Sequence, residues 1–115
     1  MEVIKERMKQ KEKVIEAVRR WVKGMQFTVT AVIIGSYARG DFNVWSDVDV
    51  LLISDYFLGN PIERLKHIDP PPGVEVIPLR IDEFRRLREK GDPIAVEADT
   101  IGIIVRDDLR IFSYR

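Results

Sequence analysis

The first part of the chain has hydrophobic residues at alternating spacings of four and three, which is the pattern of an amphipathic helix. The stripe is interrupted only by Lys11 and otherwise consists of Ile4, Met8, Ile15, Val18, Val22 and Met25. Gly24 is a suitable stop. The pattern predicts a helix over residues 2–24 that covers a sheet with its apolar side and leaves its charged side in water.

Four segments rich in β-branched and apolar residues follow, and each predicts a strand. They are residues 27–34 (FTVTAVII), 46–54 (SDVDVLLIS), 74–79 (VEVIPL) and 101–106 (IGIIVR). Pro78 has no N–H to donate, so its strand is expected to lie at a sheet edge or to end there.

Capping residues predict short helices between these strands. They are 36–39 ended by Gly40, 61–67 capped by Asn60, 83–90 between Asp82 and Gly91, and a helix from Asp92-Pro93 to about 100, followed by a final turn or short helix within 107–115. Helices interleaved with strands indicate an α/β (α+β) fold with a single mixed β-sheet and helices packed on it. A length of 115 residues predicts one domain, 1–115.

Composition narrows the class of protein. The 19 basic and 19 acidic residues cancel, which argues against a dedicated nucleic-acid binder. The chain has no cysteine, so a disulfide framework and a cysteine zinc site are excluded. A charged start and short apolar runs predict neither a signal peptide nor a spanning helix, and therefore a cytoplasmic protein.

Two aspartates stand at the start of the most apolar segment. Asp47 and Asp49 are two residues apart, so on a strand their carboxylates point to the same face. Like charges at the buried end of a strand repel each other unless a cation compensates them. The pair therefore favours a metal site, and the alternative is the exposed polar face of an edge strand.

The turn between the first two predicted strands is Gly35-Ser36. Glycine allows a ligand to approach the backbone closely, and serine offers a hydroxyl and an N–H. Nearby Arg39 is either a phosphate clamp or a surface arginine paired with Asp41. Ser46 either binds a phosphate or caps the turn. Tyr37 and Trp45 either stack on a base or anchor the loop in the core.

Together these residues resemble a known family. Gly35-Ser36, the ten residues 37–46, and Asp47-Val48-Asp49 are similar to the signature of the DNA polymerase β-like nucleotidyltransferase superfamily. The flanking Ala38-Arg39-Gly40 and Ser46-Asp47 resemble its minimal nucleotidyltransferase (MNT) branch. The resemblance implies the polymerase β-like core and a reaction in which a hydroxyl attacks the α-phosphorus of a nucleoside triphosphate.

The resemblance also implies roles for individual residues. Gly35 and Ser36 would hold the triphosphate of ATP, with Arg39 and Ser46 as further nucleotide-binding candidates. Asp47 and Asp49 would ligate two Mg²⁺ ions, and Glu75 would be the third carboxylate, a metal ligand and base for the acceptor hydroxyl. Family members often have Asp in place of Glu75.

The same resemblance suggests a partner. MNT proteins commonly accompany HEPN-domain toxins and act as antitoxins that transfer AMP to a toxin tyrosine, so a protein adenylyltransferase is expected. The alternatives are a non-catalytic antitoxin or scaffold subunit that binds a HEPN partner, and a nucleotidyltransferase acting on a small molecule or RNA. The sequence leaves open whether the chain forms homo- or hetero-oligomers.

Overall fold

The computed structural model describes residues 2–112, which fold into a four-stranded sheet and five helices. In chain order the elements are α1 Glu2–Lys23, β1 Thr30–Ile34, α2 Ser36–Arg39, β2 Val48–Ile53, α3 Pro61–Leu65, β3 Val74–Leu79, α4 Ile81–Lys90, α5 Pro93–Thr100 and β4 Ile103–Asp107. No helix in this part of the chain is long and apolar enough to cross a membrane.

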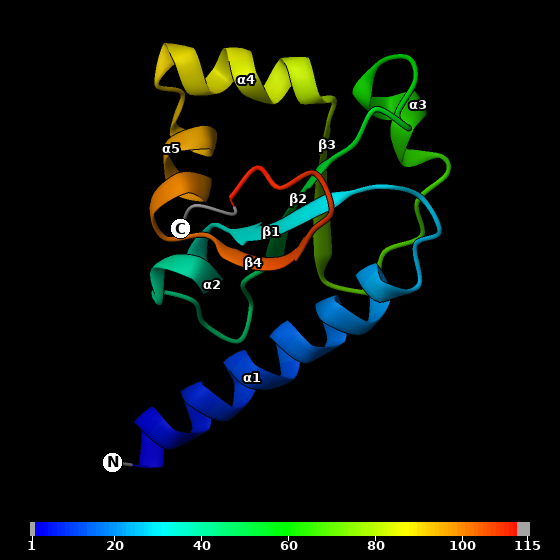
Figure 1. Ribbon diagram of the computed structural model, residues 1–115. Coiled ribbons are helices and arrows are strands. Elements are labelled where there is room, and N and C mark those ends of the chain that lie inside the picture. Colours follow the sequence, from blue (N-terminus) through cyan, green and yellow to red (C-terminus); the bar gives the residue numbers. More distant parts are fainter. Residues whose placement is uncertain (1, 113–115) are drawn as a thin grey trace.

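The strands are arranged in the order β3-β2-β1-β4. β1 runs antiparallel to both of its neighbours, whereas β2 and β3 are parallel. Helix α1 lies on one side of the sheet, and α4 and α5 lie on the other (Figure 1). The predicted α/β class, with one mixed sheet and helices packed on it, is therefore confirmed.

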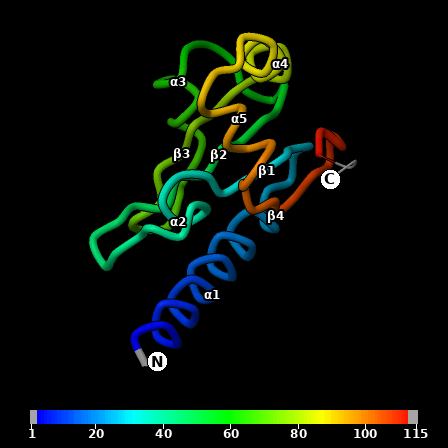
Figure 2. Tube along the Cα trace, turned by 90° about the vertical axis from the view of Figure 1, so that its left-hand side faces the viewer, coloured from blue at the N-terminus to red at the C-terminus, as the bar shows by residue number. Residues whose placement is uncertain are grey.

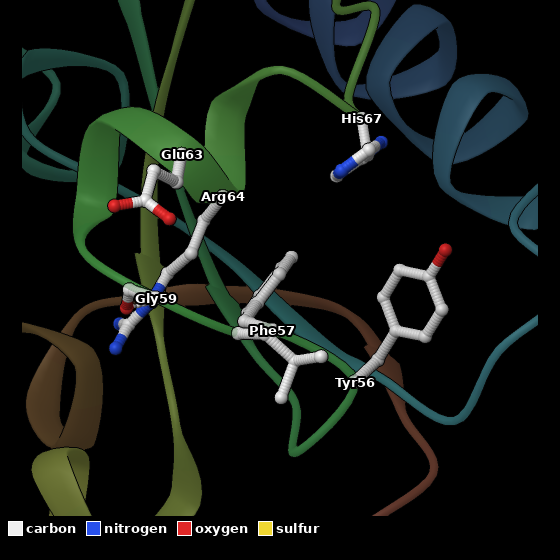
Figure 3. A pocket seen from close by; sticks show the side chains of 7 residues that line it. Tyr56, Phe57, Gly59, Glu63, Arg64 and His67 are labelled. Atoms are coloured by element: carbon white, nitrogen blue, oxygen red, sulfur yellow. Dashed lines mark hydrogen bonds between the residues drawn. The ribbon is translucent and has the colours of Figure 1, made fainter.

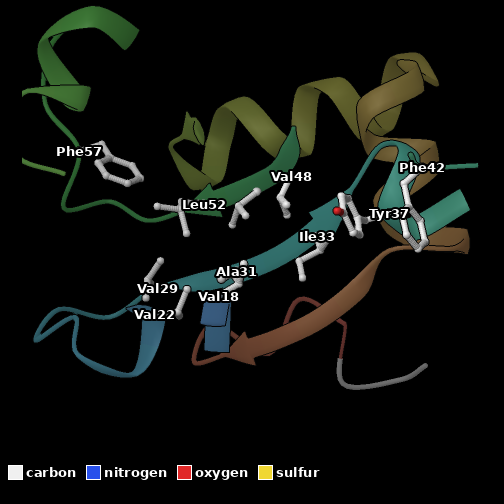
Figure 4. Close-up of a cluster of buried hydrophobic side chains, with 11 residues drawn as sticks. Val18, Val22, Val29, Ala31, Ile33, Tyr37, Phe42, Val48, Leu52 and Phe57 are labelled. Atoms are coloured by element: carbon white, nitrogen blue, oxygen red, sulfur yellow. The ribbon is translucent and has the colours of Figure 1, made fainter. Parts of the chain in front are cut away.

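Alternate residues of the central strands face α1. Val48, Val50 and Leu52 of β2 share one core with Val18 and Val22 of α1, and Figure 4 shows much of this cluster. Because side chains alternate along a strand, the residues between them face the other way. The sheet is thus buried on both sides, which explains why β2 reads as a nearly continuous apolar run.

The second core lies between the sheet and helices α4 and α5. Leu51 and Ile53 of β2 pack there with Phe84 of α4 and Ala98 of α5. Gly102, just before β4, has no room for a side chain, because a Cβ there would lie 2.6 Å from Val32 Cγ1 and 2.8 Å from the Ala98 carbonyl oxygen. This close approach fixes α5 against the sheet.

The prediction that α1 covers the sheet holds only for its second half. Ile4 and Met8 belong to the apolar stripe but are 64% and 58% exposed. Figures 1 and 2 show the N-terminal part of α1 extending past the sheet. A helix of 22 residues is about 33 Å long, which exceeds the length of these short strands.

Several predicted boundaries are correct and others are wrong by a few residues. β3 and the Asn60 cap of α3 lie where predicted, and Pro78 sits on the edge strand β3. β1 begins at Thr30 rather than residue 27, because the Thr28 carbonyl accepts the Ser54 hydroxyl and the Val29 N–H donates to the Asp108 carboxylate, so both bind side chains. β2 begins at Val48 rather than residue 46, and β4 at Ile103 rather than residue 101.

The helix ends differ in the same way. The cap of α4 is Arg80 rather than Asp82, because the Arg80 N–H donates to the Glu83 carboxylate at 2.8 Å and helical geometry begins at Ile81. Helix α3 ends at Leu65, two residues early, whereas α5 begins after Asp92 as predicted. Residues 108–109 form the predicted turn, and 113–115 lie outside the described residues.

Candidate active site

Two of the predicted carboxylates are neighbours on adjacent strands. Asp49 of β2 pairs in register with Glu75 of β3 and with Ile34 of β1. By alternation, Asp49 points to the side of the sheet that α5 covers. Asp49 is half-buried, whereas Glu75 and Asp47, which immediately precedes β2, are exposed. The three residues therefore gather at the end of the sheet where β1 finishes and β2 and β3 begin.

The Asp49 carboxylate packs directly against the backbone of Gly35. A Cβ at Gly35 would collide with an Asp49 carboxylate oxygen and lie 3.2 Å from its Cγ. Gly35 also has φ 75° and ψ −153°, a conformation that residues with a side chain rarely adopt. Glycine is therefore required here on two independent grounds, and Ser36 follows it as the first residue of α2.

Electrostatics confirm that acidic side chains are concentrated here. The pKa of Asp49 is raised above its usual value, first by burial and then by the negative charges of Glu75, Asp47 and Glu97, while Arg39 opposes the shift. A cation would relieve both the burial cost and the repulsion. The neighbourhood of Asp49 is thus suited to a positively charged ligand.

Glu97 of α5 is a site residue that the sequence did not reveal. Its Oε1 accepts a hydrogen bond from the Gly35 N–H, and both of its oxygens lie near the Arg39 guanidinium, at 3.4 Å and 3.3 Å. The available signal was a single charge within the apolar run Ile94–Ala98. Spacing alone could not place that charge beside Gly35, because 62 residues separate them.

Arg39 is held by two carboxylates. Its Nε donates to Asp41 at 3.2 Å, and its other contact is Glu97. The predicted pairing with Asp41 is therefore present. Arg39 also lies close enough to Asp49 to influence the pKa of Asp49. Its position is therefore compatible with the predicted phosphate clamp as well as with the surface pairing.

The carboxylate oxygens at this end of the sheet are suitable ligands for a hard divalent cation. Mg²⁺ prefers carboxylate oxygens and completes its octahedral shell with water and substrate phosphates, so one or two protein carboxylates suffice. Within residues 2–112, no three acidic or histidine side chains are arranged to enclose a metal by themselves. Asp47, Asp49 and Glu75 as ligands, and the number of ions, therefore stay predictions.

Three other candidates have assignable positions. The Ser46 hydroxyl accepts the Asn43 N–H at 2.9 Å, so it closes the turn. Tyr37 is buried and stacks on Phe42 at 4.3 Å, which places it in the core rather than against a base. Trp45 is 89% exposed, so the alternative that it anchors the loop in the core is wrong.

A separate pocket of about 290 Å³ lies beyond the opposite end of β2. Figure 3 shows it lined by Tyr56, Phe57, Glu63, Arg64 and His67. It contains none of the residues predicted to bind nucleotide. The candidate active site is thus the acidic end of the sheet and not this pocket.

Comparison with known proteins decides the family. The sequence pattern of the nucleotidyltransferase domain matches residues 1–112. This chain belongs to the nucleotidyltransferase domain family. The match to this nucleotidyltransferase domain is consistent with the MNT branch of the polymerase β-like superfamily.

A solved structure supports the fold of this nucleotidyltransferase domain. A crystal structure from Sulfolobus solfataricus, described as a "putative nucleotidyltransferase", is similar over 90% of this chain and 86% of its own, with a TM-score of 0.57 and 20% identity. At that identity the likeness concerns the fold alone. No curated protein matches the chain.

Proposed function

We propose that this nucleotidyltransferase domain transfers AMP from ATP, with Mg²⁺, to a hydroxyl of a partner protein. One observation supports this above the others. The Asp49 carboxylate, flanked by Asp47 and Glu75, lies against the glycine whose turn would receive the triphosphate. Metal-binding carboxylates beside a phosphate-binding turn are what transfer of a charged phosphoryl group requires.

The proposed reaction follows from these positions. The acceptor oxygen forms a bond to the α-phosphorus, the bond from that phosphorus to the oxygen bridging to the β-phosphate breaks, and pyrophosphate leaves. Glu75, exposed beside Asp49, accepts the proton of the acceptor hydroxyl. Gly35 and Ser36 orient the phosphates, and Mg²⁺ supplies charge neutralisation when it is bound.

A large acceptor is supported by the surface next to Asp47. Val44 and Trp45, in the loop that leads to it, are 73% and 89% exposed. A groove of about 420 Å³ separates this loop from the exposed first turns of α1, with Val3 and Arg7 in its lining. Exposed apolar surface is typical of protein recognition, so this loop, which leads to Asp47, favours a protein acceptor over a small molecule.

The identity of the partner follows the MNT resemblance. The proposed acceptor is a tyrosine of a HEPN toxin, so the chain would act as its antitoxin. The alternative is an antitoxin that inhibits the toxin by complex formation without catalysis. The feature that favours it is Glu75, because family members often have Asp at the position of this third carboxylate.

The test combines the chain, ATP, Mg²⁺ and a HEPN protein encoded next to it, with intact-protein mass spectrometry of the partner. We expect a mass increase of one or more AMP units, abolished by Asp47→Ala or Asp49→Ala. Asp69→Ala, which changes an exposed aspartate in the loop after α3, is the control and should leave transfer unchanged.

Two outcomes would contradict the proposal. Unchanged transfer in the Asp47→Ala, Asp49→Ala double variant would remove these residues from the mechanism. Inhibition of the toxin without any Mg²⁺-dependent ATP binding, measured by calorimetry, would establish the non-catalytic alternative.

A further inference from the structure

The Glu97 carboxylate occupies donors that a bound phosphate would need. It accepts the Gly35 N–H and lies 3.3 Å from the Arg39 guanidinium. Gly35 begins the turn proposed to hold the triphosphate, and Arg39 ends α2, the short helix that follows this turn. A negatively charged group of the protein therefore rests where a negatively charged ligand is expected.

The helix that carries Glu97 is firmly held. Ala95 and Ala98 of α5 are fully buried against the sheet. The Glu97 carbonyl accepts the N–H groups of Ile101 at 3.0 Å and Gly102 at 2.9 Å. The main chain at Glu97 is thus fixed, whereas its side chain is partly exposed to water, at 22%.

Glu97 and a phosphate oxygen cannot use these donors together. The Gly35 amide has a single hydrogen, and a carboxylate beside a phosphate adds repulsion between like charges. Binding of a triphosphate would therefore include the free energy of breaking the Glu97 contacts, which lowers the observed affinity.

We propose, on the basis of the proposed nucleotidyl transfer, that Glu97 is an autoinhibitory phosphate substitute. Its carboxylate holds Gly35 and Arg39 in the absence of nucleotide and is displaced by the triphosphate. Glu97 is thus a positioning residue, since it acts on the groups that bind the nucleotide.

The experiment measures binding of ATP with Mg²⁺, and of inorganic tripolyphosphate, by calorimetry on the full chain. Glu97→Gln and Glu97→Ala should bind both ligands more tightly than the wild type, by about tenfold, the effect of one charge-assisted hydrogen bond. The matched control is Asp99→Asn on the same helix, whose carboxylate pairs with Arg88 at 2.6 Å and whose loss should leave both affinities unchanged.

Whether the Glu97 variants bind the two ligands more tightly or more weakly distinguishes the proposed role of Glu97 from a purely structural one. Equal or weaker binding in both Glu97 variants would overturn it, as would a gain for ATP that is absent for tripolyphosphate. Tighter binding without AMP transfer in any variant would support Glu97 as the phosphate substitute and contradict the proposed function. AMP transfer combined with unchanged affinities in the Glu97 variants would support the proposed function and contradict the role of Glu97 as a phosphate substitute.

Discussion

Charged side chains gather at both ends of β2, but positive and negative charges balance each other at only one end. At the C-terminal end, the buried Arg64 donates to the Glu83 carboxylate at 2.6 Å and 3.3 Å, to the Pro78 carbonyl at 3.1 Å and to the Gly59 carbonyl at 2.9 Å. At the N-terminal end, Asp49 lies among other carboxylates.

The pKa shifts at the two ends have opposite directions. The pKa of Glu83 is lowered, chiefly by its hydrogen bond from Arg64. The pKa of Asp49 is raised, chiefly by burial and then by neighbouring negative charges. The Arg64 end therefore stabilises the folded chain, whereas the Asp49 end reduces its stability and is suited to binding a cation. This difference fits a structural role for the Arg64–Glu83 pair and the proposed ligand-binding role for Asp49.

The largest expected effect comes from filling the space at Gly35. We expect Gly35→Ala to reduce nucleotidyl transfer by about 100-fold or more, because the new Cβ would displace the Asp49 carboxylate and misplacement of reacting groups by about 1 Å has that cost. The measurement is the rate of AMP transfer to the proposed HEPN partner.

Gly91→Ala is the matched control for Gly35→Ala. Gly91 also has a positive φ, 67°, but a Cβ there would meet nothing within 4 Å. Its replacement should cost about 1 kcal/mol of stability through backbone strain and leave transfer intact. Equal loss of transfer in both variants would show that strain, and not the contact with Asp49, is responsible.

At the opposite end, removing the Glu83 charge should destabilise the fold. We expect Glu83→Gln to lower the free energy of unfolding by about 1.5–3 kcal/mol at neutral pH, because the buried Arg64 loses a charged partner. Chemical denaturation measures this. Glu16→Gln, which breaks the exposed pair with Arg19, should change stability by less than about 0.5 kcal/mol.

The same variant gives a pH dependence with a defined sign. A lowered pKa in the folded state means that Glu83 contributes its full stabilisation above the ordinary value of 4.5. That contribution is lost as the pH falls from this value through the folded-state pKa. The stability difference between the wild type and Glu83→Gln should therefore shrink on acidification, and a difference that stays constant would contradict the assignment.

The smallest expected effect is a gain in stability at the acidic end. An acid with a raised folded-state pKa destabilises the folded chain once it is ionised, so at neutral pH Asp49→Asn should stabilise it by less than about 1 kcal/mol. Thermal unfolding without Mg²⁺ measures the shift. Mg²⁺ should raise the melting temperature of the wild type more than that of Asp49→Asn, and equal shifts would place the cation elsewhere.

Much of the acidic end could be predicted from local sequence. The spacing of Asp47 and Asp49 within an apolar strand, and the Gly35 turn before them, are patterns that a few residues contain. The placement of Glu75 came from family resemblance and agrees with its register beside Asp49. Glu97 could not be predicted in this way, because its contact with Gly35 exists only once α5 packs on the sheet.

By itself the sequence determined the types and approximate limits of the helices and strands and the position of the turn. These depend on hydrophobic periodicity and capping, which act over a few residues. Only the tertiary structure decided which part of α1 is buried, which charges are balanced and what holds the Gly35 N–H. Those outcomes depend on side chains that are distant in the chain and meet only when both faces of the sheet are covered.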